Sequence, residues 1–294
     1  MHNFFINAFN MKKYLNKQLI SNKPKFTAIF LSLIIFTLSL LYSCGANLFS
    51  IQDDITLGKQ LDGEIKANQR EYPMLQGHED IKSYVSGIGN YIINNSPKIE
   101  YKNIFPYTFQ VINDTIVNAF STPGGFVYVY TGLMKFIDNE ATLVGIVGHE
   151  IAHAERRHMT QRLTSYYGVS FVLSLVLGNN PNGVSEIAAN LFVGLGFLAN
   201  SRSDETEADN YSIKYLSTTD YYPGAIKNFF DKIVQQQRQA GTTPGGLDRL
   251  LATHPLPQDR IDNVNAQIAQ LKTNTDPTRG LNIEKYNEIK SKLP

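Results

Sequence analysis

The residues best suited to chemistry form a short group near the middle of the chain, His149-Glu150-Ile151-Ala152-His153. On a helix, positions four apart lie on one face, so the imidazoles of His149 and His153 can reach one cation. Glu150 is rotated by about one hundred degrees from His149 and can instead take a proton from the attacking water. This H-E-x-x-H pattern is typical of zinc peptidases. It predicts one Zn²⁺ per chain bound by His149 and His153, with Glu150 as the catalytic base.

A catalytic zinc site needs a third protein ligand and an open position. The metzincin continuation is excluded, because Arg156 and Met159 stand where that pattern requires glycine and histidine. His158 lies five residues beyond His153 and is expected to face elsewhere, as a surface residue.

An acidic segment downstream offers the missing ligand. Glu205 and Asp209 are four residues apart and share one helix face, whereas Glu207 points roughly the other way. One carboxylate can complete a His-His-Glu site, and the other can orient a ligand imidazole or meet the substrate as an acid. The alternative is a solvated acidic helix face, which would leave the zinc site without a partner.

Several motifs together resemble the gluzincin family that includes HtpX and the CAAX prenyl endopeptidases, and in particular its soluble periplasmic lipoprotein branch. They are Asn118-Ala119-Phe120, Pro123-Gly124-Gly125, Thr131-Gly132-Leu133, His149 to His153, Ser201-Arg202 and Glu205-x-Glu207-Ala208-Asp209. The resemblance implies Glu205 as the third zinc ligand and Asp209 as the acidic catalytic partner. It also implies an α+β, mainly helical fold with a small sheet whose edge strand lines the active-site cleft.

A further histidine enters through the same resemblance. In relatives of the periplasmic branch, a Thr-His-Pro element followed by an arginine brings its histidine close to the zinc. The corresponding residues here are Thr253-His254-Pro255 and Arg260. The resemblance thus implies His254 as a regulatory fourth ligand, which would close a tetrahedral site. The alternative is an ordinary surface or packing histidine.

Hydrophobic periodicity predicts the elements that position these residues. Helices are expected over 58–96, 138–162, 203–217, 225–240 and 257–272, and strands over 105–113 and 126–130. The second strand, Phe126, Val127, Tyr128, Val129 and Tyr130, is the clearest in the chain, and we expect it to be the edge strand that binds an extended substrate. Two apolar segments, 166–177 and 184–199, are expected to be buried core helices, with a membrane-facing hairpin as the alternative.

The N-terminal region has the pattern of an export signal. A lysine-rich head precedes the apolar run 26–41, and small residues surround Cys44, the one cysteine of the chain. Its setting resembles a lipoprotein processing site, so Cys44 is expected to be acylated; a membrane anchor helix is the alternative. The expected organisation is a signal peptide over 1–43 that starts at Met1 or Met11, a tether over 44–57, a metallopeptidase domain over 58–272 and a polar tail over 273–294.

The formal net charge is +1 and no basic stripe is evident, so no nucleic-acid partner is expected. No repeat of fixed period is present, so we expect no helical-repeat extension. The sequence predicts a zinc endopeptidase, lipid-anchored in the periplasm at the outer membrane, whose substrates are unfolded or misassembled envelope proteins. The alternative is a chaperone or assembly factor for outer-membrane proteins that uses the cleft for binding. Retention of Glu150 favours the enzyme.

Overall fold

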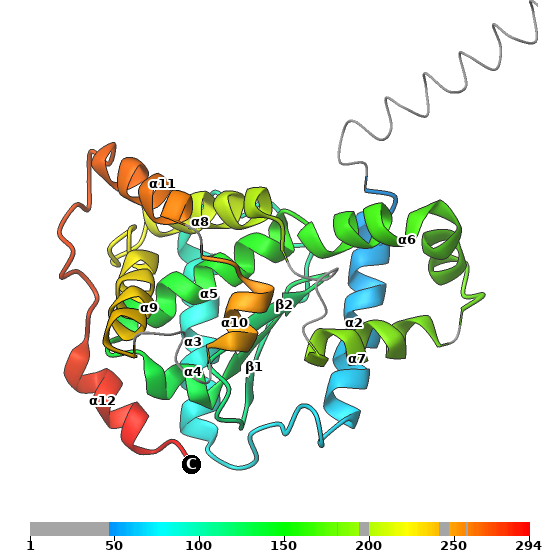
Figure 1. The fold of residues 1–294 in the computed structure, drawn as a ribbon, viewed down its shortest axis with the longest axis horizontal. Coiled ribbons are helices and arrows are strands. Elements are labelled where there is room, and N and C mark those ends of the chain that lie inside the picture. Colours follow the sequence, from blue (N-terminus) through cyan, green and yellow to red (C-terminus); the bar gives the residue numbers. More distant parts are fainter. Residues whose placement is uncertain (1–46, 181, 194–199, 241–246, 257) are drawn as a thin grey trace, which may run out of the picture. The chain divides into compact units, whose positions relative to one another are not determined.

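The computed structural model describes residues 47–180, 182–193, 200–240, 247–256 and 258–294 (Figure 1). The expected signal peptide and Cys44 lie outside these residues, as do 194–199 and the loop 241–246. The chain from Asn47 to Pro294 forms one compact unit. None of the helices in the described ranges is long and apolar enough to span a bilayer.

The described elements are mostly helices. In chain order they are α2 (Ile51–Ala67), α3 (Glu79–Asn95), β1 (Thr108–Ile112), β2 (Ala119–Thr122), β3 (Phe126–Tyr130), α4 (Thr131–Phe136), α5 (Glu140–Glu155), α6 (His158–Val176), α7 (Gly183–Val193), α8 (Arg202–Leu216), α9 (Ile226–Ala240), α10 (Asp248–Thr253), α11 (Gln258–Ala269) and α12 (Ile283–Ser291). The predicted fold class, mainly helical with a small sheet, is confirmed.

The strands of the described residues form a mixed sheet in the order β1-β3-β2. β3 pairs in parallel with β1 and antiparallel with β2. The turn between β2 and β3 contains Gly124 and Gly125, whose φ values of 78° and 88° suit glycine. β3 is therefore the central strand, and all of its residues are buried. The prediction that Phe126–Tyr130 is the edge strand is wrong: the alternation identified a strand but could not tell which of its neighbours pair with it.

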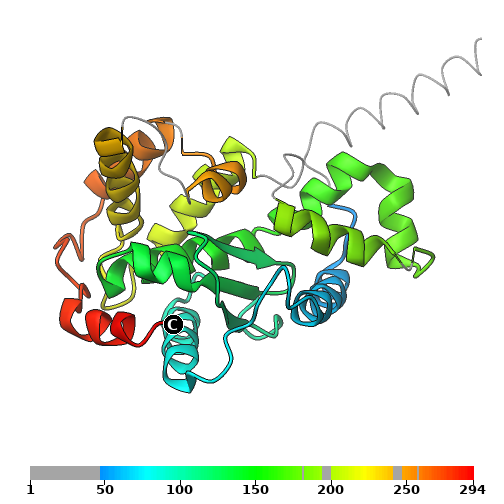
Figure 2. The same ribbon diagram turned by 60° about the horizontal axis from the view of Figure 1, so that its bottom comes forward.

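The helix α5 is buried along its whole length. It packs against α8, α9 and α3, and also against β2 and β3 (Figures 1 and 2). The Asn139 side chain caps its N-terminus by accepting a hydrogen bond from the Thr142 N–H at 2.9 Å. A Cβ on Gly145 would lie 2.5 Å from the backbone nitrogen of Ile226, so glycine lets the start of α9 approach closely.

The helix that carries the motif ends earlier than expected. It stops at Glu155 instead of continuing to about 162, because Arg157 adopts a left-handed conformation with φ 60° before α6 begins. The Arg157 guanidinium binds the buried Asp54 carboxylate and donates to the Phe49 carbonyl. These contacts tie the break between α5 and α6 to the N-terminal end of α2.

Two expected boundaries also differ. The helix α2 begins at Ile51, within the expected tether over 44–57. The expected polar tail over 273–294 contains α12, which buries Tyr286 and Ile289 against the main core. In both segments the few apolar residues face inward on a helix, and a mostly polar composition hides them.

A second, smaller core lies between α2, α6 and α7. Val172 and Ile187 are buried in it. The helix α6 bends at Gly168, where φ is 73°, and beyond the bend Leu173 and Leu177 are exposed to solvent. The segment 166–177 is thus buried on one face only, instead of being a fully buried core helix.

Candidate metal centre

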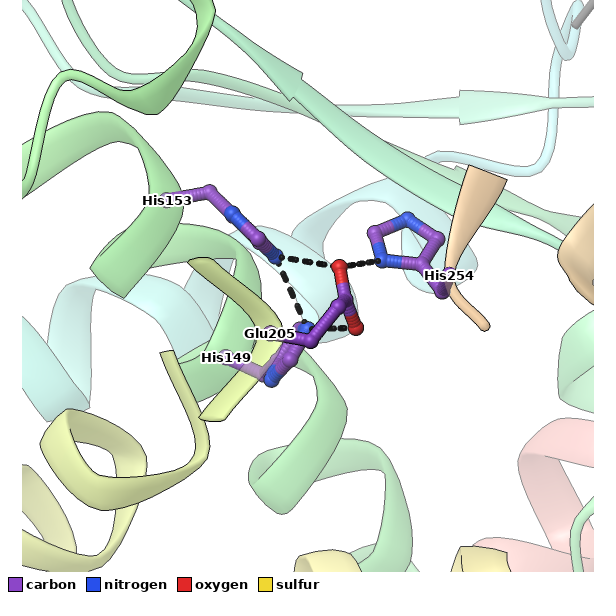
Figure 3. A group of neighbouring side chains, drawn as sticks. All are labelled: His149, His153, Glu205 and His254. Atoms are coloured by element: carbon purple, nitrogen blue, oxygen red, sulfur yellow. Dashed lines mark hydrogen bonds and ion pairs between the residues drawn. The ribbon is translucent and has the colours of Figure 1, made fainter. Parts of the chain in front are cut away.

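Four side chains converge beside α5, as Figure 3 shows. His149 and His153 project from α5, Glu205 from α8, and His254 from the end of α10. Each is buried, and one nitrogen or oxygen from each lies within 4.8 Å of those of the other three. Three imidazoles and one carboxylate at this spacing form a ligand set that suits Zn²⁺.

The imidazoles are oriented with one nitrogen toward this centre. His149 Nε2 and His153 Nε2 are 2.9 Å apart, and they lie 3.4 and 3.2 Å from the two Glu205 carboxylate oxygens. His254 Nδ1 lies 3.0 Å from Glu205 Oε1. The i, i+4 spacing on α5 thus has the predicted effect, and the helix-pair packing of α5 with α8 supplies the carboxylate.

Two of these side chains, Glu205 and His153, have pKa values shifted well below their usual values. Burial raises the pKa of Glu205, but its interactions with His254, Arg260 and His149 outweigh burial and hold that pKa well below its usual value. Burial, together with the neighbouring His149, lowers the pKa of His153 well below its usual value. Glu205 is therefore an anion and His153 a neutral imidazole, which are the protonation states that metal ligands require.

The pKa of His149 is shifted in the opposite direction, upward. Burial lowers its pKa, but Asp209 and Glu205 outweigh burial and raise it to about 10. Its Nδ1 lies 2.9 Å from Asp209 Oδ1, on the side away from the centre. Of the two roles left open for Asp209, the structure places it where a carboxylate orients a ligand imidazole. It does not border the cleft where an acid would meet substrate.

Arg260 binds both carboxylates of the α8 segment. Its Nη1 lies 2.5 Å from Glu205 Oε2, and its Nε and Nη2 each donate to Asp209 at 2.8 Å. It also donates to the carbonyl of Pro255 at 2.8 Å, next to His254. This bidentate ion pair is buried, so it fixes the orientation of both acids. In the sequence, Arg260 is indicated only by its place after the Thr-His-Pro element.

The prediction that His158 is a surface residue is wrong. His158 is buried, with 1% of its surface exposed, and its Nδ1 lies 2.7 Å from Nδ1 of His153. Its Nε2 lies 3.3 Å from Glu207, which also binds Arg156 at 2.8 Å. The expectation of a surface histidine assumed one continuous helix. The helix is instead broken at Arg157, where φ is 60°, and His158 lies beside His153. Periodicity carries no signal of that break.

A cleft opens beside the centre. It is bordered by β2 with the adjoining Asn118, by Glu150 and His153 of α5, and by His254. Glu150 faces this space, and its Oε1 lies 3.6 Å from His254 Nε2. Asn200, which the sequence analysis missed, lies 3.3 Å from His153 Nε2 and 3.2 Å from His254 Nδ1.

A second, mainly apolar pocket lies on the other side of Glu150 and His254. Its walls include Phe229, Phe230 and Ile233 of α9. The centre therefore lies between a cleft with a strand edge and a pocket suited to an apolar side chain.

The fold and the centre define a metallopeptidase: a buried H-E-x-x-H helix, a carboxylate from a second helix and a glutamate facing a cleft beside a strand edge. The sequence profile of peptidase family M48 matches residues 83–268, more than half of the chain. The chain belongs to peptidase family M48, and it is a metal-dependent peptidase.

Its relatives carry consistent names. The chain is 27% identical to the β-barrel assembly-enhancing protease of Yersinia pestis over an alignment of 239 residues that covers 78% of this chain and 46% of that protein. It is 24% identical to the protein of the same name in Escherichia coli K12, over 65% of this chain and 40% of that protein. It is 28% identical to the mitochondrial metalloendopeptidase OMA1 of Schizosaccharomyces pombe, over 69% of this chain and 58% of that protein. The match thus spans less than half of the two bacterial relatives.

Proposed function

We propose that the protein is a zinc-dependent endopeptidase of the bacterial envelope, anchored by a lipid at Cys44, that hydrolyses unfolded or misassembled envelope proteins. The observation that carries the enzymatic part is the convergence of His149, His153 and Glu205 next to Glu150. The envelope setting is supported by the N-terminal signal pattern and by the names of the bacterial relatives.

The chain's own residues divide the work. His149, His153 and Glu205 would hold the zinc, which when bound supplies Lewis-acid polarisation of the scissile carbonyl. Glu150 takes the proton of the attacking water and returns it to the leaving amine. Asp209 and Arg260 hold His149 and Glu205 in place. With three protein ligands, one position stays open for substrate.

The edge of β2 is the surface that supports binding of an extended peptide. Tyr130 N–H donates to Asn118 carbonyl at 3.1 Å, and the register continues as Ala119 opposite Val129. In an antiparallel pair the hydrogen-bonded positions alternate. The backbone groups of Ala119 and Ser121 therefore point away from β3, toward the cleft side where a substrate strand can pair with them.

His254 supports a regulated site. With His254 in place, four protein ligands surround the centre, and such a site has no position for a substrate oxygen. We propose that His254 is a latch that withdraws when substrate enters the cleft.

The deciding experiment measures metal content and casein cleavage on the full chain purified in detergent. We expect about one zinc per chain, and Glu150→Gln should keep the zinc while lowering kcat by about 100-fold or more. If Glu150→Gln cleaves as well as the parent, the assigned base is wrong. A parent that binds casein and never cleaves it would favour the chaperone alternative.

The anchor is tested separately. Cys44→Ser should leave an unprocessed precursor or release a soluble species, because the acylation site is lost. Membrane fractionation and intact mass of the parent and the variant check this. An unchanged mass and unchanged fractionation would contradict acylation at Cys44.

A further inference from the structure

The second half of α6 carries apolar side chains on two faces. Beyond the bend at Gly168, Val172 points inward and is buried in the small core with α2 and α7. The face turned away from this core is the outer α6 stripe, defined as Val169, Leu173 and Val176 of α6 and Leu177 at its C-cap, which are 58, 48, 40 and 67% exposed. Leu173 is four residues from both Val169 and Leu177 and three from Val176, so these side chains lie along one side of the helix.

The stripe lies in an uncharged stretch. Between Arg162 and Glu186 the sequence contains no charged residue. A helix face that ends in water normally carries charged side chains, whereas a contiguous apolar face without them marks an interaction site. The absence of charge favours an apolar partner. The stripe is also separate from the cleft, whose α6 wall consists of Met159, Thr160 and Arg162.

The lipid anchor proposed at Cys44 indicates that the apolar partner is a membrane. Asn47 Nδ2 donates to Thr160 Oγ1 at 2.8 Å, and Leu48 N–H donates to Thr164 Oγ1 at 3.2 Å. The start of the described chain is therefore bound to α6. Cys44 is three positions before Asn47, a length of chain that spans at most about 10 Å. A lipid on Cys44 would bring a bilayer surface next to this helix.

We propose that the outer α6 stripe lies in the surface of the phospholipid membrane to which the chain is anchored. The stripe would occupy the boundary between headgroups and acyl chains, as amphipathic interfacial helices do. This proposal rests on the lipid anchor of the proposed function. A second contact besides the lipid tether would hold the peptidase in one orientation on the membrane. In that orientation the cleft would lie beside the membrane surface and not within it.

The chain contains no tryptophan, so Leu173→Trp introduces a single reporter. The matched control is Ile283→Trp in α12, because Ile283 is 49% exposed, nearly the same as Leu173. The full-length chain is reconstituted in phosphatidylethanolamine–phosphatidylglycerol vesicles with and without brominated acyl chains. We expect Leu173→Trp to emit at shorter wavelength and to be quenched about threefold more strongly than the control. Val169→Trp is a second reporter should Leu173→Trp lose casein cleavage.

Equal quenching of the two tryptophans would overturn the proposal. So would a blue-shifted but unquenched Leu173→Trp, which would mean that a second copy or another segment of this chain covers the stripe. Flotation of the parent separates the two claims. A parent that floats while the reporter stays unquenched keeps the anchor and loses the stripe contact, and a parent that does not float contradicts both.

At the metal centre, His153 contacts a second buried histidine on the side away from the other ligands. His153 directs Nε2 toward His149 and Glu205, and its Nδ1 lies 2.7 Å from Nδ1 of the buried His158. If Nε2 is the ligand atom, Nδ1 carries the proton and donates to His158. The proton of His158 is then on Nε2, 3.3 Å from a Glu207 oxygen. Only with these tautomers does each hydrogen bond from His153 through His158 to Glu207 have one donor and one acceptor.

We infer that His158 and Glu207 are positioning residues for the metal ligand His153. They would hold the ring in its tautomer and orientation, as Asp209 does for His149. Arg156 holds the Glu207 carboxylate in place, since its Nε donates to Glu207 at 2.8 Å. Each of the two motif histidines thus has its own supporting partner.

The test measures zinc affinity by chelator competition on the full chain. His158→Phe removes the acceptor and should weaken zinc binding about 10- to 100-fold. His158→Asn places an amide oxygen near the position of Nδ1 and should restore most of the affinity. That recovery distinguishes positioning from a packing role, which Phe would fill better. Glu207→Leu, on a half-exposed side chain, tolerates substitution and should weaken affinity in the same direction by a smaller factor. Unchanged affinity in His158→Phe, or equal losses in the Phe and Asn variants, would overturn the inference.

Discussion

At the scale of single residues, the metal centre gathers charged groups in a space from which water is largely excluded. Glu205 and Asp209 are fully buried, and Arg260 is 2% exposed. Burying such groups costs several kcal/mol each unless they are paired. Here Arg260 binds both carboxylates and His149 lies beside them, so the charges offset one another. The arrangement keeps Glu205 ionised and held in one orientation.

His254 is the residue whose role is most open to direct measurement. We expect His254→Ala to raise kcat/KM on an unfolded substrate, because removing the imidazole proposed as fourth ligand would open the site. A latch stabilised by about 1.4 kcal/mol corresponds to a gain of about tenfold. The measurement is casein cleavage at fixed zinc occupancy. Asp248→Ala, an exposed change in the same helix α10, is the control and should cleave like the parent.

Two other results would change the assignment of His254. Lower activity with zinc retained would make it a donor to the transition state. Equal activity in His254→Ala and the parent would leave it as a packing residue.

At the scale of elements, the site is built where the buried helix α5 passes the antiparallel edge of the sheet. The helix carries the two histidines and the glutamate proposed as ligands and base, α8 carries the proposed third ligand Glu205, and β2 forms the backbone edge. The other edge of the sheet is partly covered, since Leu75 N–H donates to the Val111 carbonyl of β1 at 2.9 Å. Among the described strands, β2 is therefore the one available to pair with substrate.

This arrangement predicts the effect of a single backbone change. Ser121→Pro removes an N–H that points toward the cleft, and should lower kcat/KM about tenfold, since one such hydrogen bond contributes about 1 to 1.5 kcal/mol. Ser121→Ala retains the N–H and is the matched control. Peptide cleavage and zinc content are measured for both. Normal turnover by the proline variant would show that substrate binds elsewhere.

At the scale of the whole molecule, a buried carboxylate joins segments that are far apart in sequence. Glu140, at the start of α5, accepts hydrogen bonds from Tyr84 of α3, Tyr221, Asn282 and Lys285 of α12, at 2.5 to 2.8 Å. Burial raises the pKa of Glu140, but the hydrogen bonds from Lys285 and the other donors outweigh burial and lower it. The metal helix, the C-terminal helix and α3 are thereby held together.

The sign of the pH dependence follows from this lowered pKa. Stability contributed by Glu140 is present above its unfolded pKa, near 4.5, and is lost as the pH falls through its folded pKa. We expect Glu140→Gln to lower the free energy of unfolding at pH 7 by about 1 to 3 kcal/mol. The difference from the parent should shrink below about pH 4. Urea unfolding across pH checks this, with the exposed Glu284→Gln as control, and a constant difference at all pH values would contradict it.

The sequence by itself determined the chemistry and the family, because both depend on local spacing. An i, i+4 pair of histidines lies on one face of any helix, and the same rule places Glu205 and Asp209 together. The mainly helical fold with a small sheet was confirmed, as was the metallopeptidase class. The roles of the individual ligands remain predictions that the geometry supports.

Only the tertiary structure decided which strand is the edge, where the motif helix ends and what surrounds the ligands. Strand order depends on pairing between segments distant in the chain, so alternation at 126–130 could not reveal that β2 is the free edge. The break at Arg157 depends on Asp54, more than one hundred residues earlier. With the helix broken there, His158 lies against His153. The packing of α11 on α8 brings Arg260 to Glu205 and Asp209. These are long-range contacts, which periodicity does not encode.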